Sequence, residues 1–134
     1  MMDAVSIAVS GLTAQKQRLG ATASNIANIS TTGRVPGADP SAPASTVYKP
    51  LRTTLTSLGG GGVQATVTPD ENGYSVYYDP SSPQADENGL VAAPDIDLAA
   101  ESVDLIETKA AFKANLGVLK VQEEMQDSLL DVLT

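Results

Sequence analysis

Two copies of the tetrapeptide Asp-Glu-Asn-Gly, at residues 70–73 and 86–89, come nearest in this chain to a metal-binding pattern. Carboxylate and amide oxygens at such close spacing bind Ca²⁺ in EF-hand loops. Both copies lack the acidic ligand at the fifth loop position and the distal Glu that complete such a loop. Asp and Asn-Gly are also typical of tight turns, and we therefore interpret both copies as turns.

The remaining candidates for chemistry are equally incomplete. Glycines 59–62 could cradle a phosphate, but no Gly-Lys-Ser/Thr follows them and no helix is predicted to open there, so they are interpreted as a flexible joint. The chain has no cysteine and no histidine, which excludes thiol nucleophiles, imidazole bases and the usual zinc ligands. A hydrolase would have only generic Ser and Asp residues. We therefore predict no enzyme, no cofactor, no metal and no small-molecule substrate.

Charge and composition also exclude several kinds of partner. Sixteen acidic residues stand against eight basic ones, so nucleic acid and anionic membrane surfaces are poor partners. No apolar run approaches the roughly 18 residues of a membrane span, and the first residues lack the pattern of a cleaved secretory signal. The apolar content is 42%, with only 4% aromatic residues, a composition suited to helix packing.

The prolines divide the chain into three segments. All eight lie between Pro36 and Pro94, and a proline costs about 3 kcal/mol inside a helix. The pattern predicts an N-terminal assembly helix within 1–33, a Pro/Gly-rich loop and β-hairpin region over 34–94, and a C-terminal assembly helix over 95–134. The fold class is α+β, with the long terminal helices forming an antiparallel pair or coiled coil.

The N-terminal segment has a narrow apolar row. Val5, Leu12, Leu19 and Ile26 recur every seven residues, which is close to coiled-coil spacing. Residues 1–35 carry one acid and three bases, whereas residues 95–134 carry nine acids and three bases. Opposite net charges favour pairing of the two helices, although an exposed ion pair contributes only about 0 to 1 kcal/mol.

The central region contains two alternating runs on either side of the first Asp-Glu-Asn-Gly. Apolar and polar residues alternate over 63–68 and again over 74–78. Two such runs around Asn-Gly predict that these two strands pair with each other as a β-hairpin.

The C-terminal helix is predicted from about residue 97 to 133, capped by Asp95 or Asp97, with a length of roughly 55 Å. Its apolar residues form two stripes on nearly opposite faces. The first stripe is Val103, Ile106, Ala110, Ala114, Val118, Val121, Met125, Leu129 and Val132. The second stripe is Leu98, Leu105, Phe112, Leu116, Leu119, Leu130 and Leu133.

One N-terminal helix cannot cover both stripes. A large exposed apolar surface marks an association site, so self-association is favoured. The alternative is that the central β region folds back over the remaining stripe. Asp127 and Asp131 lie near the helix end, where the macrodipole disfavours acids. They are either solvated or placed to meet basic groups of a neighbour.

Two separated motifs resemble a known family. The string from Ser10 to Leu19, continuing through 24–28 to the Thr-Thr-Gly at 31–33, resembles the N-terminal signature of bacterial flagellar rod and hook proteins. Residues 113–116 and 118–120 are similar to that family's C-terminal helix. The central runs 61–63, 78–86, 89–91 and 94–97 resemble the proximal rod members.

The resemblance implies a structural subunit of the flagellar proximal rod, a drive shaft that transmits motor torque to the hook. It implies partners among copies of the chain and other flagellar rod proteins, with export through the flagellar type III apparatus, no cleaved signal and no direct membrane insertion. The location implied is the basal body, where the rod crosses the periplasm. Another short rod protein of the family, a helical adaptor and an export chaperone remain alternatives.

The expected subunit interface combines the terminal apolar rows with three polar positions. Asn25, Asn28 and Asn115 are candidates for fixing helix register, as buried Asn does in coiled coils; capping or exposure is the alternative. The apolar members are Val5, Leu12, Leu19, Ile26, Val103, Leu105, Ile106, Phe112, Leu116, Val118, Leu119, Val121, Met125, Leu129 and Leu130.

Overall fold

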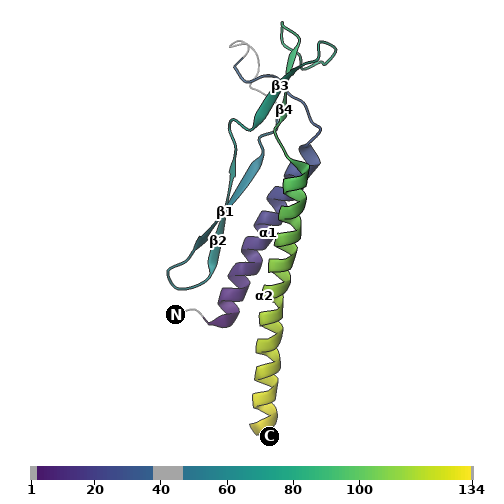
Figure 1. Ribbon diagram of the computed structural model, residues 1–134. Coiled ribbons are helices and arrows are strands. Elements are labelled where there is room, and N and C mark those ends of the chain that lie inside the picture. The colour runs from purple at the N-terminus through teal and green to yellow at the C-terminus, as the bar shows by residue number, and fades with distance from the viewer. Residues whose placement is uncertain (1–2, 38–46, 134) are drawn as a thin grey trace. The chain divides into compact units, whose positions relative to one another are not determined.

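The computed structural model describes residues 3–37 and 47–133, and the side chains at 132 and 133 lie outside this description (Figure 1). It confirms the α+β prediction, with two long terminal helices and a central β region. The elements are α1 (Ala4–Asn28), β1 (Leu51–Ser57), β2 (Val63–Pro69), β3 (Tyr74–Tyr78), β4 (Leu90–Pro94) and α2 (Leu98–Leu133). Predictions that fall on residues 1–2, 38–46 and 134, and on the side chains of Val132 and Leu133, lie outside the described residues.

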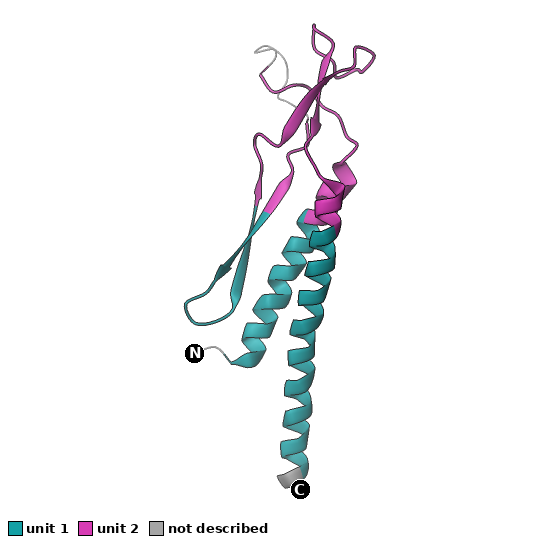
Figure 2. Cartoon of the chain, in the orientation of Figure 1, with its two compact units in different colours: residues 1–21, 53–67, 103–134 teal, residues 22–52, 68–102 magenta. Residues whose placement is uncertain are grey.

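The chain divides into two compact units (Figure 2). Unit 1 comprises residues 1–21, 53–67 and 103–134, and unit 2 comprises residues 22–52 and 68–102. Each helix contributes to both units, because α1 and α2 cross the boundary between residues 21 and 22 and between residues 102 and 103 respectively.

Both helices begin at an acidic cap. The Asp3 carboxylate accepts a hydrogen bond from the Ser6 backbone N–H at 2.7 Å, and hydrogen bonding by Ser6 lowers the pKa of Asp3. At α2, the Asp97 carboxylate accepts hydrogen bonds from the N–H groups of Ala99 at 2.8 Å and Ala100 at 3.3 Å. Asp97 is therefore the cap, as one of the two sequence alternatives predicted. With 36 residues, α2 is about 54 Å long.

The predicted hairpin between 63–68 and 74–78 is wrong in its pairing. Both strands exist, but β2 pairs with β1, and β3 pairs antiparallel with β4, with Tyr74 opposite Pro94 and Tyr78 opposite Leu90. The backbone groups at the two ends of the connecting turn are already bonded elsewhere. The Asp70 N–H donates to the Pro50 carbonyl at 2.8 Å, and the Gly73 carbonyl accepts from the Asp95 N–H at 2.9 Å.

Both Asp-Glu-Asn-Gly copies are turns, as predicted. The Asp70 carboxylate accepts from the Asn72 N–H at 3.1 Å, and the Asp86 carboxylate accepts from the N–H groups of Asn88 and Leu90, each at 2.8 Å. The part of the chain that the structure describes holds no group of three or more His, Cys, Asp or Glu side chains that could bind a metal ion.

The glycine run is also a turn, and the interpretation as a flexible joint is not supported. The Leu58 N–H donates to the Gly62 carbonyl at 3.1 Å, and the Gly61 N–H donates to the Leu58 carbonyl at 2.9 Å. Gly61 and Gly62 have φ angles of 97° and 90°, a backbone conformation that residues other than glycine rarely adopt. The run therefore closes the β1–β2 hairpin.

The apolar core is small. In unit 2, Val91 and Ala92 are fully buried, and Ala92 exchanges two backbone hydrogen bonds with Gly33, at 2.8 and 2.9 Å. In unit 1, the buried apolar residues are alanines: Ala8, Ala14, Ala21 and Ala65. Val91 is the largest side chain that is fully buried among the described residues. Across residues 3–37 and 47–133, no helix is long and apolar enough to span a membrane.

Candidate assembly interface

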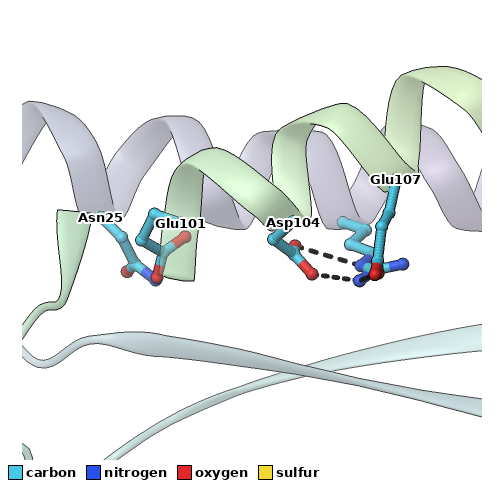
Figure 3. A network of polar contacts seen from close by, with 5 residues as sticks. Asn25, Glu101, Asp104 and Glu107 are labelled. Atoms are coloured by element: carbon cyan, nitrogen blue, oxygen red, sulfur yellow. Dashed lines mark hydrogen bonds and ion pairs between the residues drawn. The ribbon is translucent and has the colours of Figure 1, made fainter. Parts of the chain in front are cut away.

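An ion pair joins α1 to α2 within unit 1. The Arg18 guanidinium donates to Asp104, with Nε 3.1 Å from one carboxylate oxygen, and reaches Glu107 at 3.0 Å. Figure 3 shows Asp104 and Glu107 directed at the same guanidinium. The hydrogen bond to Asp104 is the main cause of the raised pKa of Arg18. This geometry confirms the expectation that opposite charges help to pair the two helices.

The rest of this helix contact consists of small and polar residues. A Cβ atom on Gly11 would lie 2.6 Å from the Asn115 side-chain oxygen, so the α1 backbone approaches α2 directly. Gln15 and Thr108, on the same faces, are 7% and 2% exposed. Because Gly11 lies near Asn115 while Arg18 meets Asp104, the two helices run antiparallel, as predicted. The helix contact therefore uses neither apolar stripe as its main surface.

The two glycines of α1 should respond oppositely to the same substitution. Gly20→Ala meets nothing within 4 Å, so the better helix propensity of Ala should raise the free energy of unfolding by about 0.5 to 1 kcal/mol. Gly11→Ala makes the same local change but forces Asn115 aside, breaking its 2.9 Å bond to the Ala111 carbonyl. We expect a net loss of about 1 to 2 kcal/mol. Urea denaturation measures both values, and equal stabilisation by the two variants would contradict the close contact.

The predicted stripes of α2 are largely exposed. Ile106 is 68% exposed and Leu129 is 64% exposed, and among the described second-stripe side chains of unit 1 only Leu119 is partly buried. The other exposed members include Val103, Leu105, Phe112, Leu116, Val118, Val121, Met125 and Leu130. A single chain therefore leaves both stripes available for association.

The heptad row of α1 lies beside the helix contact. Leu12 follows Gly11 by one residue, which turns its side chain about 100° away from the face that meets α2. Val5 and Leu19 are exposed, and Leu12 and Ile26 are partly buried. Ile7 and Val9 are also exposed apolar residues, which the seven-residue spacing did not identify.

The three asparagines have different surroundings. Asn25, in unit 2, is 2% exposed and is the centre of a hydrogen-bond network. Its amide nitrogen donates to the Leu51 carbonyl at 2.9 Å and to Glu101 at 2.7 Å, and its oxygen accepts from the Leu51 N–H at 2.8 Å and the Tyr48 hydroxyl at 3.0 Å. Asn28 and Asn115 instead donate to carbonyls of their own helices, Ser24 and Ala111, each at 2.9 Å.

Beyond Gln122, α2 has no α1 alongside it. With Gly11 beside Asn115 in an antiparallel pair, the first residue of α1 reaches the level of about residue 122. Gln122 is the last partly buried residue, and the described side chains from 123 to 131 are exposed. In Figure 2 the teal part of α2 continues past the start of α1. We call residues 123–133 the α2 overhang.

Known proteins with similar sequences are flagellar. The family model described as "Flagella basal body rod protein" matches residues 6–33. The flagellar basal-body rod protein FlgC of Agrobacterium fabrum is 35% identical, covering 97% of this chain and 93% of the relative. FlgC of Borreliella burgdorferi is 30% identical over 99% and 97% of the two chains, and FlgC of Bacillus subtilis is 27% identical over 96% and 95%.

Proposed function

Because the chain belongs to the flagellar basal-body rod protein family, and is thus a structural subunit of the rod, we propose that it assembles into the proximal rod through its exposed apolar faces and helps to carry torque to the hook. The family resemblance of both terminal motifs is confirmed by relatives that match nearly the whole chain. The relatives are structural rod proteins, and a structural role accords with the exposed apolar side chains along α2.

One observation supports this proposal most strongly: the large apolar side chains lie outside and the small ones inside. Apart from two prolines, the buried apolar side chains described are alanines and valines, while Ile106, Met125 and Leu129 are each more than half exposed. Burying one such side chain contributes about 1.5 to 3 kcal/mol. A row of them along one helix therefore provides a large gain on association, from which ordering and association costs must be subtracted.

We assign the interface to the terminal segments. The α1 row of Val5, Leu12, Leu19 and Ile26 would meet one neighbour, and the two α2 stripes would meet others. Segments 1–33 and 95–134 would then be the assembly segments, and 34–94 would contact other rod proteins or surrounding rings. In this proposal the flagellar type III apparatus exports the chain to the rod, within the periplasmic part of the basal body.

Purified basal bodies from a deletion strain test the function. Removal of the gene should abolish motility, and expression of the full chain should restore motility and place the chain in the isolated rod. A chain without residues 121–134 should be produced but fail to enter the rod. A monomeric adaptor or export chaperone would instead be absent from purified rods. A fully motile strain carrying the truncation would exclude an essential role for the end of α2.

A further inference from the structure

The exposed second-stripe face of α2 carries charges within its heptad pattern. Leu105, Phe112 and Leu119 recur every seven residues at one position. Gln126 continues this row, and a second position four residues further along each heptad holds Lys109, Leu116, Glu123 and Leu130. Lys109 and Glu123 thus lie at positions where a coiled coil normally has apolar residues, and both are exposed. Neither makes an ion pair within the described chain.

From this pattern, and resting on the proposed function, we propose that α2 helices of neighbouring copies pack in parallel with a stagger of two heptads, so that Lys109 of one copy faces Glu123 of the next. In a parallel pair, residues at this second position of one helix face residues at the same position of the other helix. Fourteen residues separate Lys109 from Glu123, and the stagger is therefore about 21 Å.

The same shift matches two pairs of apolar residues, while Phe112 meets Gln126 of the neighbour. It places Leu105 against Leu119 of the neighbour, and Leu116 against Leu130. Leu116 is 51% exposed and Leu130 63% exposed, so both have surface to lose on pairing. Leu130 and Glu123 lie in the α2 overhang, where α1 does not compete for space.

Two other registers are less favourable, because one sets like charges against each other and the other sets a lysine beside a leucine. In an unshifted parallel pair, Lys109 faces Lys109 and Glu123 faces Glu123, which disfavours that register. An antiparallel pair can also bring Lys109 near Glu123, but it then sets Lys113 beside Leu119. The two-heptad parallel shift instead sets Lys109 against Glu123 and keeps Lys113 on the flank of the pair, away from the apolar positions.

A staggered pair uses two different segments of the second-stripe face of α2, one from each copy. Each copy offers its Lys109 end to one neighbour and its Glu123 end to another, so the contact is heterologous. Heterologous contacts that do not close into rings generate open helical assemblies. The proposed occupant of this face is therefore a second copy of the chain, which meets it through a heterologous contact.

Charge reversals in the full chain test the pairing. Lys109→Glu and Glu123→Lys should each raise the protein concentration at which assembly begins by about tenfold, because each places like charges together. The double variant should return to within about twofold of the unmodified chain. Glu124→Lys is the control for Glu123→Lys, since it makes the same charge change one residue away and off this face; the Glu124 side chain is 63% exposed, and its 3.8 Å ion pair is with Lys120 of the same helix. Sedimentation at fixed salt measures all four.

Cross-linking tests the stagger itself, because the chain contains no cysteine. Mixed assemblies of Leu116→Cys and Leu130→Cys chains should form a disulfide between the two variants, whereas assemblies of either alone should form little. Unaltered assembly by both charge reversals, or equal cross-linking in the unmixed Leu116→Cys sample, would overturn the stagger. Those results would leave the rod function standing as long as the unmodified chain restores motility, whereas failure to restore motility contradicts the function itself.

Discussion

Replacing Val121, Met125 and Leu129 together with glutamine is expected to abolish assembly and motility while leaving the fold of the single chain intact. These three first-stripe residues are 54%, 57% and 64% exposed in the single chain, so they contribute little to its stability. In the assembly, losing their burial removes roughly 5 to 9 kcal/mol per contact. Glutamine is a good helix former, which keeps the local helical preference.

Two measurements separate the effects of this triple variant. Sedimentation velocity should show a chain that stays monomeric at concentrations where the unmodified chain assembles, and thermal unfolding of the single chain should shift by only a few degrees. The control is Val121→Leu, Met125→Leu and Leu129→Met, which preserves an apolar face and should still assemble. A glutamine variant that assembles normally would show that the first stripe is not an interface.

Replacing Asn25 with alanine is expected to cause the largest loss of stability from a single substitution in unit 2. The carboxamide satisfies both the N–H and the carbonyl of Leu51, at the start of β1, and also bonds Glu101 and Tyr48. Removing it leaves buried polar groups without partners, each costing about 1 to 3 kcal/mol. We expect the free energy of unfolding to fall by about 2 to 4 kcal/mol in urea denaturation.

Asn28→Ala is the matched control for this variant. It removes an equivalent carboxamide one turn of helix away, but among the described residues the Asn28 side chain bonds only the Ser24 carbonyl of its own helix. Its loss should cost less than about 1 kcal/mol. Asn25→Asp is a further probe, because it loses the donor to the Leu51 carbonyl and places a second carboxylate beside Glu101. Equal effects of Asn25→Ala and Asn28→Ala would contradict the central place of Asn25.

The helices were predictable because their signals are local. The absence of proline from both ends and the Asp97 cap are read directly from neighbouring residues, and both agree with the structure. The charge difference between the ends also predicted their pairing, which Arg18 and Asp104 show. Such signals depend on propensity and short-range bonding, and these operate before any tertiary contact forms.

The strand partners and the helix contact face depend on tertiary structure, and the sequence patterns did not identify them. The Asn-Gly turn after β2 suggested a local hairpin, yet Pro50 and Asp95 bond the backbone groups at its two ends. Likewise, the apolar seven-residue row suggested the face that pairs the helices. Gly11 instead allows the backbone to approach Asn115 closely, and this steric fit has no signal in hydrophobic periodicity.

Asn25 was predicted to fix helix register at the subunit interface, and within the single chain its side chain has a different role. Its bonds reach β1 and Glu101 within unit 2. The signal that could have identified this role is the polar face formed by Gln15, Thr22 and Asn25 at helical spacing, since all three are buried. Whether Asn25, Asn28 and Asn115 also specify register between subunits stays a prediction.

Hydrogen exchange over residues 123–131, compared between the single chain and the assembly, tests the central claim most directly. The account predicts that these amides exchange within a few-fold of unstructured rates in the single chain, because the described side chains there are exposed and α1 does not reach them. In the assembly, they should be protected by at least about a hundredfold, as neighbouring copies bury the α2 overhang. Equal protection in both states would contradict the claim that α2 is completed by its neighbours.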